Sequence, residues 1–353
     1  GTRPRKNDPR VVGSGSSMFG DRLLSTAPLQ ESVDPDGLLG ETYHTGVARW
    51  NTDVLGLYTG VGDSAQSVED LSIGVNSGDT VTGILFTDLL LCIGYAKDAA
   101  EAAGQDFAWP IHYWAQGERD VNEGTNKADY MAMVKQYYND LVKWANIRMD
   151  ANFAPDFIVY QNGNPNSIIL GQLNFDPIDG LLQLGLDEPH MYCVGPAYQV
   201  EYTDGLHMTA LSYRRYGEQI GKVVRAVRDG EDWKPLYWTN VARSGTTITI
   251  TYHVPRSGLS LDTTTLPPQT DMGFTYSGAN ITNVAVTATN KVEITIDADA
   301  GGTLGYARVP DLVGGIGAPD GCYGNLRDND VAVAFFDNFP LYNWACHQEE
   351  VIA

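Results

Sequence analysis

At 353 residues, the chain is longer than one ordinary hydrophobic core supports, so two domains are expected. Its composition, 43% hydrophobic and 19% charged, is typical of a globular protein and excludes a disordered one. The net charge of -21 repels phosphate backbones and anionic lipid surfaces, so nucleic acid and membranes are not expected as partners. A phosphate-bearing substrate is disfavoured for the same reason.

The apolar stretches and the cysteines add two exclusions. The most apolar run, residues 83–96, is interrupted by an aspartate and is shorter than the about 20 residues of a membrane span, so no membrane insertion is expected. The cysteines show no CxxC spacing, which argues against a zinc site. Cys92 and Cys193 lie in apolar runs and are expected to be buried, whereas Cys322 and Cys346 could form a disulfide in an oxidising compartment.

Up to about residue 234, short apolar runs typical of strands alternate with longer runs of helical periodicity. This alternation predicts a parallel sheet covered on both faces, that is, a three-layer α/β domain of flavodoxin-like character. In such a sheet, functional loops gather at the carboxyl ends of the strands. Strands are predicted at 53–60, 107–117, 155–163 and 191–196, and helices at 80–104, 127–149 and from 208 to about 227.

From about residue 235 the pattern becomes all-β. Residues 246–254 alternate threonine with isoleucine, tyrosine and valine at period two, and residues 283–300 look like two strands around a Thr-Asn turn. These features predict a C-terminal β-sandwich. The chain is therefore divided into an α/β domain, residues 1–234, and an accessory domain, residues 235–353.

Polar residues close one of the predicted strands. Gln116 could donate an amide N–H to a developing oxyanion, Gly117 allows close backbone approach, and Glu118 could orient its neighbours. A polar triplet is costly to bury at the end of a buried strand, so a functional role is plausible. The alternative is a polar turn in which Glu118 forms an ion pair with Arg119 or Arg214.

An acid and a base precede the helix predicted from residue 208. Asp204 and His207 stand three apart in a glycine-containing loop that follows the predicted strand 191–196. A histidine acts as a general base when a partner fixes its tautomer and stabilises its imidazolium form, and an aspartate at this spacing could reach the second ring nitrogen. The alternative is that Asp204 caps the helix and that His207 is an ordinary half-buried side chain.

Together, Trp-Ala-Gln-Gly-Glu at 114–118 and Asp-Gly-Leu-His at 204–207, the latter followed by Ser-Tyr-Arg-Arg, resemble the motifs of the SGNH (GDSL-like) hydrolases. The nearest branch is the carbohydrate O-acetylesterases related to sialate O-acetylesterase, including the esterase modules of bacteriophage tailspikes. Connecting segments at 17–32, 40–48 and 62–74 resemble that branch in the same order, as does the C-terminal part.

The resemblance implies a serine esterase that removes O-acetyl groups from a polysaccharide and needs no metal or organic cofactor. The tailspike relatives suggest an extracellular or virion-associated protein and a homotrimer. The positions that would carry the site are His207 (general base), Asp204 (orienting carboxylate), Gln116 and Gly62 (oxyanion donors), and Gly117 and Glu118 (site support).

The family carries its nucleophile in a Gly-x-Ser block at the end of the first strand. Gly15-Ser16-Ser17 is a degenerate version of this block, with Ser17 as the in-chain candidate, but the two valines before it look too short for a buried strand. The catalytic serine and the first strand are therefore expected upstream of Gly1, or on a second polypeptide. The alternative is a non-catalytic glycan-binding or structural virion module that has lost the nucleophile.

Overall fold

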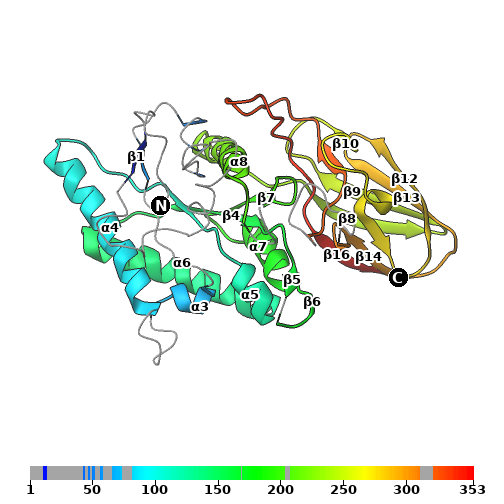
Figure 1. Cartoon of the computed structure of the whole chain (residues 1–353), viewed down its shortest axis with the longest axis horizontal. Coiled ribbons are helices and arrows are strands. Elements are labelled where there is room, and N and C mark those ends of the chain that lie inside the picture. The colour runs from blue at the N-terminus through cyan, green and yellow to red at the C-terminus, as the bar shows by residue number, and fades with distance from the viewer. Residues whose placement is uncertain are drawn as a thin grey trace.

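The computed structural model describes residues 11–13, 43, 47, 50–51, 56–58, 66–73, 82–167, 169–202, 207–310 and 321–353. Figure 1 shows a helix-rich part that holds the parallel strands and, beside it, a part of β-strands that contains the C-terminus. The earlier and later portions of the chain thus fold into different kinds of layer, as the change in sequence pattern predicts.

The centre of the helix-rich part is a parallel sheet that is apolar on both faces. Successive residues of its middle strand point to opposite sides, so Phe157 and Val159 enter one core and Ile158 and Tyr160 the other. Both faces therefore need a covering layer. The predicted parallel sheet is confirmed. Its strands, in sheet order, are β3 (Ile111–Tyr113), β4 (Asp156–Gln161) and β7 (Met191–Pro196).

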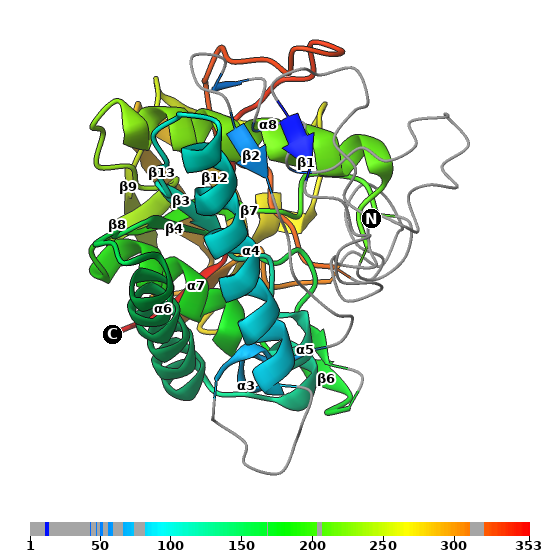
Figure 2. The ribbon, with the colours of Figure 1, turned by 90° about the vertical axis from the view of Figure 1, so that its left-hand side faces the viewer.

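Helices cover the sheet on both sides, with α8 on one side and α6 and α7 on the other in Figure 2. The three predicted helices, now α4, α6 and α8, are confirmed, and α7 is an additional one. The helices are α3 (Val68–Leu71), α4 (Thr82–Ala102), α5 (Glu118–Glu123), α6 (Lys127–Met149), α7 (Asp176–Asp187) and α8 (Ala210–Arg228), with a small hairpin of β5 (Asn166–Ser167) and β6 (Gln172–Leu173).

A short strand lies near the start of the chain. β1 (Val11–Gly13) pairs in parallel with β2 (Gly56–Tyr58). The two valines were expected to be too short for a buried strand; they do form a strand, because ladder hydrogen bonds to a partner can hold one of this length, and its burial lies outside what the structure describes. The Gly15-Ser16-Ser17 block comes soon after β1 in the sequence and lies outside the described residues.

The later part of the chain consists of antiparallel strands around a core of their own. β9 alternates half-buried and buried residues along its whole length, as its period-two pattern predicts. The predicted fold class, an α/β part followed by an all-β part, is confirmed. The sheets are β12-β13-β9-β8, β11-β14-β16 and β10-β15, made of β8 (Tyr237–Ser244), β9 (Thr247–His253), β10 (Leu259–Leu261), β11 (Phe274–Tyr276), β12 (Ile281–Ala288), β13 (Lys291–Ile296), β14 (Gly302–Tyr306), β15 (Leu326–Asp328) and β16 (Gln348–Ile352), with a 3-10 turn η4 (Thr270–Gly273).

Side chains cross the predicted domain boundary in both directions. Tyr198, from the segment after β7, packs in the core of the β part, and Cys346 packs in the α/β core beside Cys193. The division between residues 234 and 235 stays a prediction. All four cysteines are buried and none forms a disulfide, so the expected burial of Cys92 and Cys193 is confirmed and the disulfide considered for Cys322 and Cys346 is not formed in this structure.

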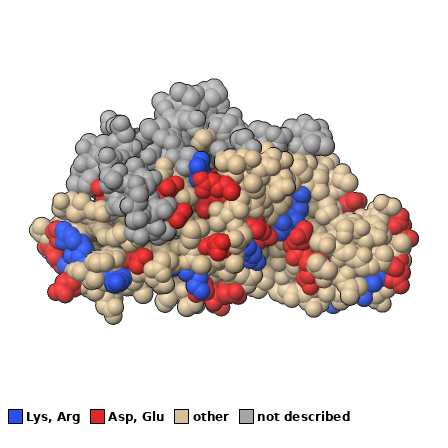
Figure 3. Space-filling view, turned by 90° about the horizontal axis from the view of Figure 1, so that it is seen from below, with Lys and Arg blue, Asp and Glu red and all other residues tan. Residues whose placement is uncertain are grey.

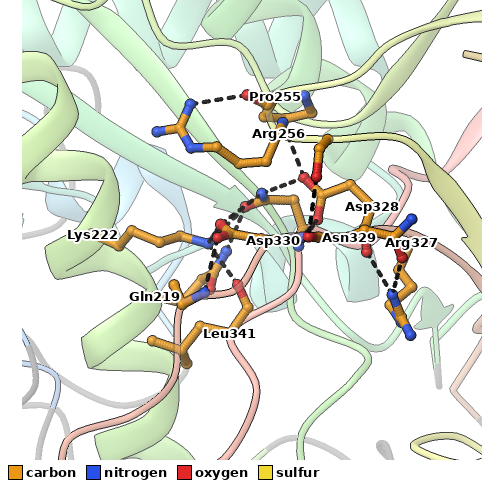
Figure 4. A network of polar contacts seen from close by, with 12 residues as sticks. Gln219, Lys222, Pro255, Arg256, Arg327, Asp328, Asn329, Asp330 and Leu341 are labelled. Atoms are coloured by element: carbon orange, nitrogen blue, oxygen red, sulfur yellow. Dashed lines mark hydrogen bonds and ion pairs between the residues drawn. The ribbon is translucent and has the colours of Figure 1, made fainter. Parts of the chain in front are cut away.

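A buried polar network joins α8 to the segment between β15 and β16 (Figure 4). The Lys222 ammonium lies 2.8 Å from a carboxylate oxygen of Asp330, and it also donates to the carbonyl of Leu341 at 2.6 Å and to Asn343 Oδ1 at 3.0 Å. Asn343 in turn donates to Asp328 at 2.7 Å. Burial would raise the pKa of Asp330, but the charge and hydrogen bond of Lys222 outweigh it and hold that pKa below its ordinary value. Paired charges thus tie the two parts together.

The surface carries charges of both signs. Figure 3 shows acidic and basic side chains interspersed over a largely uncharged face. Several of them form pairs within one helix, such as Lys97 with Glu101 in α4 and Arg225 with Asp229 at the end of α8. In the part of the chain that the structure describes, no helix combines the length and apolarity needed to cross a bilayer.

Candidate functional site

The carboxyl ends of β3, β4 and β7 meet at one edge of the parallel sheet. There the chain continues from β3 into Trp114–Glu118, from β4 into Asn162–Asn164 and from β7 into the segment that leads to α8. Both predicted motifs therefore belong to the same edge, as the parallel topology requires. The structure describes Gln116, Gly117, Glu118 and His207, whereas Asp204, Gly62 and Ser17 lie outside the described residues.

Gln116 is buried, and its amide is fully engaged. Its Nε2 donates to the carboxylate of Asp120 and, over 3.2 Å, to the carbonyl of Gln66, while its Oε1 accepts from the hydroxyl of Tyr130 at 3.1 Å. A side-chain amide carries two N–H hydrogens, so both are in use. Gln116 thus fastens the start of α5 to α6 and to the residue before the α3 cap. Its role as an oxyanion donor stays a prediction that requires one of these bonds to be exchanged.

Asp120 is the centre of that support, and sequence reasoning missed it. Its carboxylate accepts hydrogen bonds from the backbone N–H of Val68 and from the hydroxyl of Thr125, each at 3.0 Å, besides the one from Gln116. Burial raises the pKa of Asp120, and these hydrogen bonds oppose the rise. An acid so held keeps the turn before α5 in one conformation.

Gly117 allows the close approach that the sequence predicts, and the group that approaches it is Asn162. The glycine caps α5 at φ 143°, a backbone conformation that side chains rarely adopt. A Cβ at this position would lie 2.7 Å from Nδ2 of Asn162 and 3.1 Å from its Oδ1. Gly117 therefore leaves room for a polar side chain from the neighbouring strand.

Glu118 and His207 are electrostatic neighbours. Glu118 is the first residue of α5, His207 lies just before α8, and both are half-buried. Burial raises the pKa of the Glu118 carboxyl, and the charge of a protonated His207 lowers it. Two residues singled out by separate motifs thus share one electrostatic environment at the edge of the sheet.

Tyrosine hydroxyls lie around Glu118. The hydroxyls of Tyr43 and Tyr160 are 3.3 Å apart, and that of Tyr202 donates to the carbonyl of Ala197 at 3.0 Å. Burial raises the pKa of each of these tyrosines, and the nearby Glu118 charge adds to the rise. They therefore stay neutral at neutral pH and make the surroundings of Glu118 polar without adding charge.

The two arginines considered as ion-pair partners of Glu118 lie next to other carboxylates. Arg119 pairs with Glu123 one turn later in α5, at 2.5 Å, and Arg214 lies 3.7 Å from Glu218 within α8. Both arginines thus have acidic neighbours on their own helices. The environment of Glu118 is tyrosine and histidine instead.

Helix α8 is capped by Thr209. Its hydroxyl accepts a hydrogen bond from the backbone N–H of Ser212 at 3.1 Å, which satisfies one of the free N–H groups of the first turn. Thr209 thus holds the N-cap position that the alternative gave to Asp204, and Asp204 itself lies outside the described residues. His207 lies just before the cap, at the entrance to α8.

Asn162 is a second residue that sequence reasoning missed. It immediately follows β4 and is 1% exposed, and neither end of its amide has a hydrogen-bond partner among the residues that the structure describes. The signal was present in the sequence: Gln161, Asn162 and Asn164 are amides at the carboxyl end of a predicted strand. Gln161 and Asn162 were assigned to the predicted strand 155–163, and Asn164 follows it.

Two other histidines have structural surroundings. His190 lies at the amino end of β7, bonded to Asp156 at 3.3 Å, which is the opposite edge of the sheet. His112 stacks on Phe157 with ring centroids 5.2 Å apart, and burial lowers its pKa to about 4. Within the described ranges, no group of three or more His, Cys, Asp or Glu side chains is arranged to hold a metal ion.

Comparison with known proteins gives a fold match only. No family model and no curated protein matches the chain. Among solved structures, the carbohydrate acetylesterase XAC1771 from Xanthomonas citri matches with a TM-score of 0.58 at 14% sequence identity. The match covers 87% of this chain and 64% of that one, so this chain spans less than two thirds of the length of that protein. A protein from Arabidopsis thaliana, AT4G34215, matches with a TM-score of 0.36 at 15% identity, over 51% of this chain and 65% of that one.

Proposed function

We propose that this chain is a carbohydrate esterase that removes O-acetyl groups from a polysaccharide by serine chemistry. The fold shared with a carbohydrate acetylesterase supports an esterase. The observation that carries the proposal is that the segments of Glu118 and His207 follow strands of the same parallel sheet and that the charge of His207 reaches Glu118, so an acid and a base from separate motifs lie at the edge where α/β proteins bind substrates. The motif resemblance supports the finer assignment to the SGNH hydrolases and their sialate O-acetylesterase branch.

In the proposed reaction, a serine hydroxyl attacks the carbonyl carbon of the acetyl group while His207 accepts the hydroxyl proton. The carbonyl oxygen becomes negatively charged in the tetrahedral intermediate. When the intermediate collapses, the bond to the sugar oxygen breaks and His207 returns the proton to that oxygen. Water then attacks the acyl-serine with His207 again as the base, which releases acetate and restores the serine.

The charges around His207 suit a base that must hold a proton briefly. Asp204 keeps its predicted role of orienting the imidazole. Glu118 adds a second acid whose ionisation is coupled to His207, because burial raises the Glu118 pKa and the protonated imidazole lowers it.

The nucleophile is proposed to be Ser17. β1 and β2 form a two-stranded parallel sheet of their own in the described structure, and loops that follow parallel strands emerge at the carboxyl ends of those strands, where functional loops gather. The Gly15-Ser16-Ser17 block follows β1 in the chain. A serine from this block would therefore need no second polypeptide.

The proposed substrate is an O-acetylated polysaccharide without phosphate groups, met outside a cell or on a virion surface. The formal charge of -21 supports the lack of phosphate, because a net negative charge repels phosphate groups.

The test is acetate release, measured with p-nitrophenyl acetate and with O-acetylated polysaccharides. His207→Ala is expected to lower kcat by about 10²–10⁴-fold, the usual contribution of a general base. His190→Ala, at the opposite edge of the sheet, is the matched control and should keep wild-type activity. A His207→Ala variant that releases acetate at the wild-type rate removes the proposal.

The nucleophile is tested in the same assay. Ser17→Ala should abolish acetate release and labelling by a serine-directed inhibitor, while Ser14→Ala and Ser16→Ala serve as controls from the same segment. Labelling that persists in Ser17→Ala but is lost in one of the controls reassigns the nucleophile. A wild-type protein that binds the polysaccharide and releases no acetate indicates the non-catalytic glycan-binding module instead.

A further inference from the structure

Asn162 stands out from the neighbouring amides because its polar atoms are unused. Gln161, one residue earlier, accepts from the backbone N–H of His347 at 2.8 Å and donates to the His347 carbonyl at 3.1 Å. Asn164 accepts from the backbone N–H of Asn166 at 2.8 Å. Asn162 lies between them, is 1% exposed, and has a partner for neither Nδ2 nor Oδ1 within the described part of the chain.

A buried amide without partners destabilises the folded state, because it loses its hydrogen bonds to water and gains none. Folded proteins leave few such groups, and those that persist are often found where a ligand supplies the missing partner. An apolar residue would fill this position at lower cost. The presence of an amide here therefore calls for a polar group that the protein itself does not provide.

The position of Asn162 connects it to the proposed site. Its amide lies against Gly117, whose missing Cβ would stand 2.7 Å from Nδ2. The residue after that glycine is Glu118, the electrostatic neighbour of His207. Asn162 follows the middle strand of the parallel sheet, so its amide is placed between the two loops that carry the motifs.

Gln116, the donor expected from the sequence, differs from Asn162 in this respect. Both N–H groups of Gln116 are committed to Asp120 and Gln66. A preorganised oxyanion donor works because its N–H is already in place and has no competing acceptor to leave. Of these two amides, Asn162 is the one with an uncommitted N–H in the described structure.

We propose that the side-chain amide of Asn162 donates a hydrogen bond to the acetyl carbonyl oxygen as that oxygen becomes negatively charged. Gln116 then acts as a positioning residue that holds the turn before α5. The inference rests on the proposed esterase function and adds to it the donor that stabilises the oxyanion. No proton is transferred to the carbonyl oxygen, and the N–H bond of Asn162 stays intact. When the intermediate collapses, an electron pair of the oxyanion re-forms the carbonyl double bond, and the sugar oxygen leaves with the electrons of the broken bond and takes the proton from His207.

The test uses Asn162→Leu, which keeps the branched side-chain shape but removes the polar atoms, and Asn162→Ala as a second variant. With acetate release from p-nitrophenyl acetate as the assay, kcat should fall by about 10²–10³-fold with KM changed little, because the bond forms mainly in the transition state. The thermal midpoint of Asn162→Leu should stay at or above the wild-type value, because no existing hydrogen bond is lost and no cavity is left. Asn164→Leu is the control: its side chain is already bonded, so its midpoint should fall.

The outcomes separate this inference from the function it rests on. If the wild-type protein releases acetate and both Asn162 variants keep kcat within about threefold, a factor far below that of an oxyanion donor, the inference is overturned and the esterase stands. A rise in KM at unchanged kcat overturns it as well, as does a loss of kcat accompanied by a large fall in the thermal midpoint in both variants. A wild-type protein without acetate release refutes the proposed function, and the role of Asn162 with it.

Discussion

The junction around Lys222 and the sheet edge around Glu118 both bury polar groups, but they differ in how far those groups satisfy one another. At the junction, Lys222 bonds to Asp330, Leu341 and Asn343, and Asn343 bonds to Asp328. At the edge, Asn162 has two unused amide atoms in the described structure, and Glu118 has a pKa raised by burial. A network in which every buried polar group has a hydrogen-bond partner fixes the arrangement of two parts of a protein. Buried polar groups without a partner remain able to bind a ligand.

The largest expected effect is at the junction. Lys222→Met leaves Asp330 and Asp328 buried without their cation, so the free energy of unfolding should fall by about 3–5 kcal/mol. Unfolding in urea measures this change in the free energy of unfolding. Arg225→Met is the matched control on the same helix, because its ion pair with Asp229 is exposed and contributes about 0–1 kcal/mol. Equal losses in the two variants would show that the buried network adds nothing beyond an ordinary surface pair.

A smaller loss of stability is expected at Gly117, where Asn162 packs closely against the backbone. Gly117→Ala places a Cβ 2.7 Å from Asn162 at φ 143°, so overpacking should cost about 1–3 kcal/mol and backbone strain about 1–2 kcal/mol. Because Asn162 must move, acetate release should fall too. Gly104→Ala separates the two causes: φ there is 69°, with open space around the added methyl group, so only the strain remains. If both variants lose the same stability, the contact with Asn162 is not tight.

The smallest effect concerns the acid at the edge and depends on pH. The folded state holds the proton of Glu118 more tightly than the unfolded chain does, so the stability contributed by this group is highest at low pH and declines as pH rises from the unfolded to the folded pKa. Glu118→Gln removes that decline. At neutral pH the variant should be more stable than the wild type, by up to about 1 kcal/mol given the partial exposure of the carboxyl.

At acidic pH, where Glu118 is protonated, the advantage of Glu118→Gln should vanish. Unfolding in urea across this pH range measures the difference. Glu101→Gln, on the exposed face of α4, is the control and should show little change at any pH. A Glu118→Gln variant that is less stable than the wild type at neutral pH would mean that the His207 charge, rather than burial, dominates at this carboxyl.

Much of the fold could be predicted because its signals are local. The apolar runs that became β4 and β7, and the helical stretch of α6, are set by residues close together in the chain. β1 was not recognised as a strand, because its stability comes from pairing with β2 rather than from its own apolar length. The buried stripe of α6, which includes Tyr130 and Tyr137, shows the same limit, since only the packed neighbours define the rotation of the helix.

The candidate site was predicted in part. The motifs containing Glu118 and His207 meet at one edge of the sheet. This could be inferred from the sequence alone, because loops that follow parallel strands gather at the carboxyl ends of those strands. The bonding of Gln116 and the cap at Thr209 could not be foreseen, because several residues nearby could have filled each role. Asp204, Gly62 and Ser17 stay predictions.

The sequence by itself determined the fold class, the residues that close each parallel strand and the chemical types available at the site. The tertiary structure decided which of those polar groups are already bonded: Gln116 is occupied by Asp120 and Gln66, and Asn162 is left with an unused amide in the described structure. The physical reason is that a hydrogen bond depends on where two groups lie in space. Residues distant in the chain supply the partners, and only folding brings them within reach.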